Sequence, residues 1–434
     1  MSAPTVHPQD HVSPAASGPE LRAPESDLHA TMRAELTTRF AERRALVERY
    51  GPDFVHLWQL TAEQAQGGKL VRPLLLVEAH TAMSEATGRS WASREQVLTL
   101  ASALELLHFA FLLHDDVIDG DLYRRGHLNL VGTLSAEQET GRAPRDGATT
   151  PSPEGLHWGQ SGAILAGNLL LSQVHQVFAR IDVPLEVRER LLDLLDLAIT
   201  ETVAGEHSDV ALSDRVAAPD LETILATAVH KTATYSFALP LRLAAVLADA
   251  PAAWEERLDT TARHLGLAFQ LQDDYLSTFG DAARHGKDPL SDLREGKETA
   301  IIAFARLTSA WSRVRDCFGN RNVSEESARR AVEALRECGA DRFVLGLVAE
   351  HREALGALLA DDGAAHPFAD DGTRRAGGML GDTEPLRPAS GTASWGTASS
   401  GTASSDDASS APPLPPRLRA LLGALDAELV GRQS

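Results

Sequence analysis

The chain has 434 residues, enough for one large domain or two ordinary ones, and 43% of them are hydrophobic, so a sizeable core needs no disulfides. Its net charge of -20 argues against a nucleic-acid partner, because no basic stripe is present to release counterions from phosphates. The two cysteines lack metal-ligand spacing, and the N-terminal stretch lacks the basic start and apolar core of a signal peptide. We therefore expect a cytoplasmic protein.

Residues 1–27 are rich in Pro, Ser and Ala without periodicity, which predicts a disordered tail. From residue 28 to residue 361, apolar residues recur at spacings of three and four, and strand-like alternation is scarce. Examples of this helical pattern are Leu185–Ala204, Leu221–Leu239 and Glu325–Glu337. The pattern predicts an all-α fold, a single large helical bundle.

The most apolar segment is Val97–Leu113, which is just short of the roughly 20 residues that span a bilayer. It also contains Ser102, Glu105 and His108, which are costly in lipid. We therefore expect a buried core helix and no membrane span.

Two stretches interrupt the helical pattern. Residues 135–156 form a polar segment rich in Pro and Gly, which predicts a loop inserted between helices. Residues 362–416 contain GTASWGTASSGTASS, which is typical of a low-complexity linker. Residues 417–434 return to an amphipathic pattern, and we expect this C-terminal helix to dock on the same domain.

An acidic motif follows the apolar segment directly. At about 100° per residue, Asp115 and Asp119 fall on one helical face, with Asp116 beside them. Three carboxylates at a helix C-terminus are unfavourable unless a cation is present. Hard oxygen ligands of this kind suit Mg²⁺, which also binds substrate phosphates. The alternative is an acidic helix end exposed to solvent.

Lysine is rare in this chain. Of its 41 basic residues, four are lysines and the other 37 are arginines. The lysines are Lys69, Lys231, Lys287 and Lys297, each beside Gly or Thr in a short motif: GGK, HKT, HGK and EGK. A compact ammonium on a flexible stem suits a phosphate oxygen, so this distribution favours a phosphate-bearing ligand over chance placement.

A second acidic motif, Phe269-Gln270-Leu271-Gln272-Asp273-Asp274, also follows a largely apolar helix. It lies 158 residues after the first motif, so only folding can bring the two together. Alone, this pair is weak evidence. Together, the two motifs predict an acidic rim that binds metal ions, with the lysines as its cationic counterpart.

These elements together resemble the trans-prenyltransferases, also called polyprenyl synthetases. The resemblance covers residues 28–361 and the last helix. It is carried by motifs in the family's order: GGKLVRP at residues 67–73, LH at 107–108, LHDDVID at 113–119, RRG at 124–126, KT at 231–232, FQLQDD at 269–274, GD at 280–281, GK at 286–287 and DLREGK at 292–297.

The resemblance implies a Mg²⁺-dependent enzyme of the isoprenoid synthase fold, with a central active-site cavity and three ions per site. Asp115, Asp119 and Asp273 would bind these ions, and Asp116 would support them. The allylic diphosphate would contact Arg124, Lys231 and Lys287, and isopentenyl diphosphate would contact Lys69, Arg72, His108 and Arg125. Thr232 and Gln270 would lie beside the developing allylic cation. The resemblance also implies a homodimer. On the residues alone, His108 is explained equally well as a core histidine.

The sequence departs from the family pattern at Leu70, where a basic residue is frequent, and at Ser277, because the second motif reads DDxxS. Asp273, Ser277 and Asp281 are each four residues apart, which is similar to the metal triad of class I terpene cyclases. A cyclase is therefore one alternative, although it has no use for the GGKxxRP and RRG motifs. A non-catalytic subunit of a heteromeric prenyltransferase is another, although the aspartates that it would lose are present.

Product length is expected to depend on the residues below the first acidic motif. Phe111 lies four residues before Asp115, about 6 Å deeper on the same helical face, and the small Ala110 lies beside it. In the family, bulky aromatic residues at these two positions stop elongation early. One small and one large residue favour a twenty-carbon product, geranylgeranyl diphosphate, over farnesyl or longer products.

Overall fold

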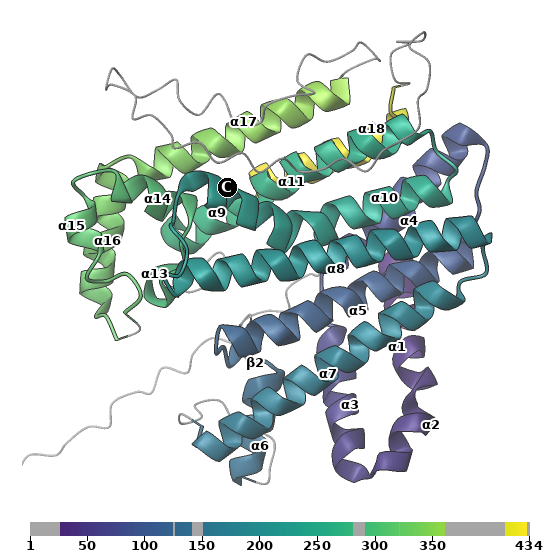
Figure 1. Ribbon diagram of the computed structural model, residues 1–434, viewed down its shortest axis with the longest axis horizontal. Coiled ribbons are helices and arrows are strands. Elements are labelled where there is room, and N and C mark those ends of the chain that lie inside the picture. The colour runs from purple at the N-terminus through teal and green to yellow at the C-terminus, as the bar shows by residue number, and fades with distance from the viewer. Residues whose placement is uncertain are drawn as a thin grey trace, which may run out of the picture.

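The protein is described by a computed structural model covering residues 27–124, 126–140, 151–280, 291–320, 322–360 and 413–431. These residues are almost entirely helical, as predicted (Figure 1). The first half contains α1 (Asp27–Glu42), α2 (Arg44–Val47), the 3₁₀ helix η1 (Glu48–Tyr50), α3 (Pro52–Ala65), α4 (Val71–Thr87), α5 (Arg94–Ile118), α6 (Leu130–Thr140), α7 (Pro153–Arg180) and α8 (Leu185–Ser213). The second half contains α9 (Leu221–Ala228), the π-helix η2 (Val229–Ala238), α10 (Leu239–Leu247), α11 (Ala252–Phe279), α13 (Ser291–Glu295), α14 (Ala300–Arg306), α15 (Trp311–Val314), α16 (Glu325–Glu337), α17 (Ala340–Ala360) and α18 (Pro416–Gly431).

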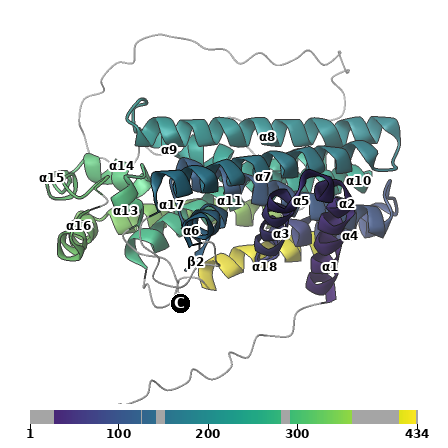
Figure 2. The same cartoon turned by 90° about the horizontal axis from the view of Figure 1, so that it is seen from below.

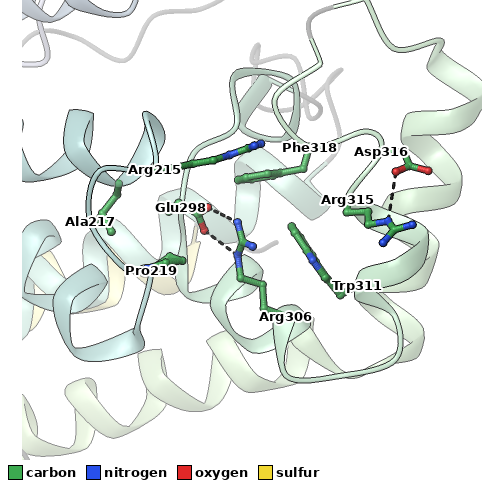
Figure 3. Close-up of a pocket in the computed structure, with 10 residues that line it drawn as sticks. Arg215, Ala217, Pro219, Glu298, Arg306, Trp311, Arg315, Asp316 and Phe318 are labelled. Atoms are coloured by element: carbon green, nitrogen blue, oxygen red, sulfur yellow. Dashed lines mark hydrogen bonds and ion pairs between the residues drawn. The ribbon is translucent and has the colours of Figure 1, made fainter.

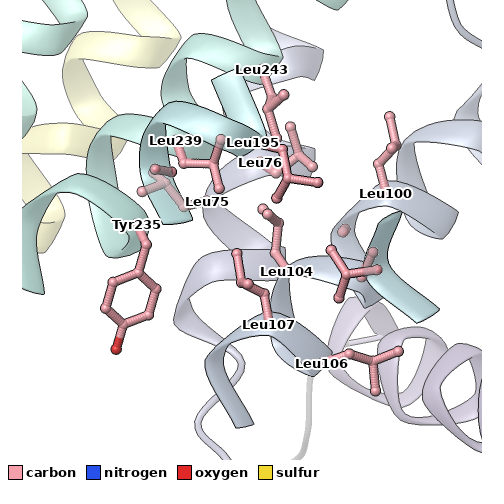
Figure 4. Packing of buried hydrophobic residues seen from close by; sticks show 14 of the residues in the cluster. Leu75, Leu76, Leu100, Leu104, Leu106, Leu107, Leu195, Tyr235, Leu239 and Leu243 are labelled. Carbon is pink, nitrogen blue, oxygen red and sulfur yellow. The ribbon is translucent and has the colours of Figure 1, made fainter. Parts of the chain in front are cut away.

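The helix α5 forms the centre of the main core. Ser93 and Gln96 form a reciprocal capping box that fixes its start, and Asp119 caps its end. Leucines of α5 pack against leucines of α4, α8 and α10, as Figure 4 shows. Of the described helices, α5 alone is long and apolar enough to cross a membrane, but 67% of its apolar window is buried inside the protein. It is therefore the core helix that its polar residues predicted.

The long helices lie side by side around this core. α5 packs on α7, α8 packs on η2, and α11 packs on both η2 and α17. Figure 2 shows α8 along one outer face of the molecule and α18 near the opposite face. A second hydrophobic cluster joins the end of α11 to α14, α15, α16 and α17. The two acidic motifs lie at the ends of α5 and α11, so packing around one bundle brings these distant segments together.

The predicted loop at residues 135–156 was too wide. α6 continues to Thr140, because Leu134 and Ser135 are buried beside α7. α7 already begins at Pro153, where the Ser152 side chain accepts a hydrogen bond from the Gly155 backbone and Pro occupies the first helical position. Residues 141–150 lie outside the described part of the chain.

The predicted tail at residues 1–27 and the linker at residues 362–416 lie outside the described residues, except at their inner ends. α18 packs on α4 and α17. Its Asp426 pairs with Arg352 of α17 at 2.6 Å, and Arg417 pairs with Glu78 and Glu85 of α4. The last described helix thus belongs to the same bundle.

Candidate active site

Three carboxylates from two helices meet at the end of α5. Asp115 and Asp119 of the first acidic motif lie with Glu206 of α8 so that one oxygen of each is within 4.8 Å of the others. All three side chains are half-buried. Glu206 was not predicted from the sequence, because it lies within a long helix without a short motif to mark it. Only its spacing of three residues from Asp209 on an amphipathic helix hints at a shared polar face.

Lys231 neutralises part of this acidic cluster. Its ammonium lies 3.2 Å from Asp115, 2.9 Å from Glu206 and 2.6 Å from Asp209. Burial alone would lower the pKa of Lys231, but the surrounding carboxylates more than offset this and raise the pKa above its usual value. Lys231 therefore stays charged at neutral pH. It is carried by the π-helix η2, a rare element that is frequent at functional sites.

Arg124 is a second cation in contact with the aspartates of the first acidic motif. It lies in a hairpin of two short strands, β1 (Tyr123–Arg124) and β2 (His127–Leu128). Its guanidinium contacts the buried Asp116 at 2.6 Å and Asp115 at 3.3 Å. Burial raises the pKa of Asp115, but Lys231 and Arg124 outweigh it, so the net shift is downward and Asp115 is a carboxylate at neutral pH.

The second acidic motif approaches the first through Lys297. The Lys297 ammonium lies 3.7 Å from Asp119, and its charge also acts on Asp274 at the end of α11. Burial, with the neighbouring charges of Asp292 and Asp273, raises the pKa of Asp274 to about 8. Lys297 thus lies beside the first motif, and its charge also acts on the second motif, 158 residues further along the chain.

A short polar chain runs beside this rim. The Thr232 hydroxyl donates to the Gln270 carbonyl oxygen at 3.1 Å, and the Gln270 amide donates to Asp274 at 2.8 Å. The structure therefore brings together the two residues that were predicted to flank the allylic cation. Their oxygens supply dipoles without a full charge, which suits a cation that has to react further.

A separate polar group lies two helical turns earlier along α5. Arg72 donates to the Tyr235 hydroxyl at 3.1 Å and to the Ser236 hydroxyl at 2.7 Å. His108 lies 3.2 Å from the same Tyr235 hydroxyl. The buried Nε of Arg72 has no hydrogen-bond partner among the described residues. Tyr235 and Ser236 were missed from the sequence, because neither stands in a recognised motif.

Tyr235 also contacts the predicted chain-length residue. Its ring packs edge-on against Phe111 with centroids 5.1 Å apart, and the Arg72 guanidinium lies 4.7 Å from its centre. Phe111 is half-buried, while Ala110 is fully buried. Arg72 and His108 both contact the Tyr235 hydroxyl, and we call them the Arg72–His108 pair. Tyr235 therefore links this pair to the aromatic ring of Phe111.

The comparisons with known proteins identify this arrangement. The polyprenyl synthetase family model matches residues 57–335, which is more than half of the chain. This chain belongs to the polyprenyl synthetase family. A short chain isoprenyl diphosphate synthase from Methanocaldococcus jannaschii is 31% identical over 273 residues, covering 62% of this chain and 73% of that protein. A geranylgeranyl diphosphate synthase from Methanosarcina mazei is 30% identical over 290 residues, covering 66% and 78%.

Solved structures agree with this assignment. A geranylgeranyl pyrophosphate synthase from Corynebacterium glutamicum, solved with isoprenyl diphosphate and magnesium, aligns over 93% of this chain and 98% of its own, with a TM-score of 0.73 and 25% identity. The polyprenyl synthetases are trans-prenyltransferases and in general depend on Mg²⁺. The predicted resemblance, all-α fold and enzyme class are therefore confirmed.

Not every predicted site residue of this polyprenyl synthetase is placed. Arg125 and Lys287 lie outside the described residues. Asp273 is not among the three carboxylates that lie within 4.8 Å of one another, so its role as a metal ligand stays a prediction. Lys69 is exposed. Leu70 adopts a left-handed φ of 56°, and its side chain is buried, so this departure from the family pattern serves packing.

The residues present fit a divalent cation. Asp115, Asp119 and Glu206 offer hard oxygen ligands, as Mg²⁺ prefers. One carboxylate oxygen of Glu206 is buried and has no hydrogen-bond partner among the described residues. Burial, followed by the charges of Asp115 and Asp209, raises the pKa of Glu206, although Lys231 opposes the shift. A bound cation would stabilise the charged form of this carboxylate.

Proposed function

We propose that this polyprenyl synthetase joins allylic diphosphates to isopentenyl diphosphate in the presence of Mg²⁺ and makes geranylgeranyl diphosphate. The observation that carries the proposal is the presence of two distinct polar groups along α5. One is the acidic cluster of Asp115, Asp119 and Glu206 with its lysines, and the other is the Arg72–His108 pair. A reaction between two diphosphate substrates requires two such sites.

In this mechanism the allylic diphosphate lies at the acidic cluster. Mg²⁺, when bound, would supply positive charge that neutralises the leaving diphosphate. We infer three ions per site and Asp273 as a further ligand, from the family resemblance. Lys231 and Arg124 would hold the diphosphate oxygens, since both cations already lie among the aspartates. The Thr232 and Gln270 oxygens would stabilise the positive charge that develops on the allylic carbon.

The second substrate is held so that its double bond faces that carbon. Arg72 and His108, with Arg125 and Lys69, would bind the diphosphate of isopentenyl diphosphate. The apolar wall of Phe111 and Tyr235 would exclude water, which would otherwise quench the cation. The carbon–oxygen bond of the allylic diphosphate would break, and the diphosphate would leave with the electron pair. The double bond of isopentenyl diphosphate would then attack the allylic carbon to form the new carbon–carbon bond, and a proton would leave to the released diphosphate. No side-chain nucleophile takes part.

The product length follows from Phe111. Its half-buried ring below the first aspartate motif would stop a growing chain, while the small Ala110 leaves room beside it. We propose that this combination allows twenty carbons. The relatives do not decide this point, since a (2E,6E)-farnesyl diphosphate synthase from Mycobacterium tuberculosis is also 32% identical over 283 residues, 63% of this chain and 68% of that protein.

The test of the reaction class is diphosphate release with each substrate alone and with both. We expect release only when farnesyl diphosphate, isopentenyl diphosphate and Mg²⁺ are all present. A class I cyclase would instead release diphosphate from geranylgeranyl diphosphate without isopentenyl diphosphate. Ser277, the residue that raised this alternative, lies on α11 and is 3% exposed.

We also propose that the protein is a homodimer that pairs through α7 and α8. Large hydrophobic side chains are exposed on both helices: Trp158, Ile164, Leu165, Leu185, Leu197 and Val203. Light scattering is expected to give twice the chain mass for the wild type. The double variant Trp158→Glu and Leu165→Glu is expected to give one chain mass with unchanged helicity, and a variant that remains dimeric would contradict this interface.

A further inference from the structure

A cleft of about 440 Å³ lies between the end of α8 and the segment around α14 and α15 (Figure 3). Its lining does not include Asp115, Asp119 or Glu206 of the acidic cluster. Its volume falls within the range of about 300–1,000 Å³ that is typical of small-molecule sites. Arg215 and Pro219 line one wall, and Arg306, Trp311 and Phe318 line another. None of these residues takes part in the proposed chain elongation.

The lining of this cleft is basic in an otherwise acidic protein. It holds three arginines and two acids, whereas the whole chain carries a net charge of -20. The charge of Arg306 is balanced by Glu298, whose buried carboxylate it contacts through both Nε and Nη2. Arg215 has no ion pair among the described residues, and the exposed Arg315 pairs with its sequence neighbour Asp316 at 3.4 Å. The exposed Arg215 is therefore the one cation of the lining that no described acid balances, and Arg315, in its exposed pair, lies near it to add a second contact to an anion.

The floor of the cleft is apolar. Leu212 and Phe318 are buried, and the Trp311 ring packs edge-on against Phe318 with centroids 5.7 Å apart. The Arg306 guanidinium lies 4.1 Å from the centre of the Trp311 ring, so its ion pair with Glu298 also holds this ring in place. An apolar group can therefore pack against Trp311 and Phe318 while a negatively charged group contacts Arg215 and Arg315.

From this lining we propose that the cleft is a second ligand site, which takes an amphipathic anion of the class of the prenyl diphosphates. The choice of ligand rests on the proposed function, because elongation would place such molecules nearby. The cleft is close to the acidic cluster along the chain. Its lining residue Leu212 lies one helical turn after Asp209 on α8, and its lining residue Glu298 directly follows Lys297. Geranylgeranyl diphosphate supplies both the charged head and the apolar chain that this lining requires.

The test is a calorimetric titration of the full-length protein with geranylgeranyl diphosphate, with and without Mg²⁺. The cleft variant is Arg215→Asn with Arg315→Ala, in which Asn tolerates the left-handed φ of 59° at position 215. Its matched control is Arg329→Ala with Arg330→Ala, which removes two exposed arginines from α16. Inorganic diphosphate serves as the head group alone, and thermal unfolding checks that each variant is folded.

We expect two binding sites for geranylgeranyl diphosphate per wild-type chain in the presence of Mg²⁺. One of them should still bind this ligand in EDTA. In the cleft variant that Mg²⁺-independent site should weaken at least fivefold, while elongation of farnesyl diphosphate stays within twofold of wild type. A single site that the cleft variant leaves unchanged would overturn the proposal, as would equal affinity for inorganic diphosphate. If the wild type elongated no substrate, the proposed function would be wrong. The number of geranylgeranyl diphosphate sites per chain would still show whether the cleft binds this ligand.

Discussion

Glu206 adds a third carboxylate to the acidic cluster, and no motif in the sequence marked it. Its carboxylate lies with those of Asp115 and Asp119, and one of its buried oxygens has no described partner. We predict that Glu206→Gln raises the Mg²⁺ concentration for half-maximal activity by about tenfold or more, because a ligand or an orienting contact is lost. Glu189→Gln, an exposed position on the same helix, serves as the control. An unchanged Mg²⁺ dependence would exclude Glu206 from the metal site.

Tyr235 connects Arg72 and His108, the two residues of the proposed second substrate site. Its hydroxyl contacts both Arg72 and His108, so Tyr235→Phe removes two polar contacts but keeps the ring against Phe111. We predict about a tenfold rise in the KM for isopentenyl diphosphate, from roughly 1.4 kcal/mol of lost orientation. The KM for the allylic substrate and the product length should stay the same. Equal rises in both KM values would point to a general structural effect. Tyr50→Phe, at an exposed position, is the matched control.

At the scale of elements, the position of Lys231 depends on how closely α8 approaches the π-helix η2. A Cβ atom added at Gly205 would lie 2.3 Å from the Lys231 backbone nitrogen and 2.7 Å from its Cα. We predict that Gly205→Ala separates the two helices and lowers kcat by at least tenfold. Gly356→Ala on α17, where an added Cβ meets nothing within 4 Å, should leave kcat unchanged. Normal activity in Gly205→Ala would mean that η2 tolerates displacement.

The packing of α11 on α17 includes two histidines whose Nδ1 atoms lie 3.0 Å apart. Burial, and then the charge of His264, lowers the pKa of His351 to about 4, and burial also lowers the pKa of His264. The unfolded chain therefore binds more protons than the folded one between about pH 6.5 and pH 4, so stability falls as the pH falls through this window.

His351→Gln tests this linkage. The variant should lose less stability between pH 6.5 and pH 4 than the wild type, by about 2 kcal/mol, as measured by chemical unfolding at each pH. His175→Gln, at an exposed histidine, should retain the pH dependence of the wild type. Parallel stability curves for the wild type and His351→Gln would show that the histidine pair stays charged or accessible in the folded protein.

The elements were predictable to different degrees, for physical reasons. Helical periodicity predicted the all-α bundle, and the segment Glu325–Glu337 matches α16 at both ends. The same periodicity did not predict the π-helix at Val229–Ala238, because a segment of 10 residues is too short for its apolar spacing to distinguish a π-helix from an α-helix. Short motifs marked Asp115 and Lys231, whereas Glu206 and Tyr235 join the site only through packing between helices.

At the scale of the whole molecule, the fold and the family are established, and the proposal concerns what the bundle makes. Packing around α5 places the acidic cluster, Lys297 and the Arg72–His108 pair within one bundle. The arrangement is that of an enzyme with two diphosphate substrates. The central claim is therefore that this chain extends an allylic diphosphate, and that the chain stops at twenty carbons.

The most direct measurement is mass spectrometry of the products formed from farnesyl diphosphate and isopentenyl diphosphate with Mg²⁺, alongside Phe111→Ala. We predict geranylgeranyl diphosphate as the main wild-type product and longer chains from the variant, because the ring that limits the chain is removed. Longer wild-type products, or an unchanged distribution in Phe111→Ala, would contradict the account of chain length. No elongation, with hydrocarbon formed from geranylgeranyl diphosphate alone, would contradict the account of the reaction itself.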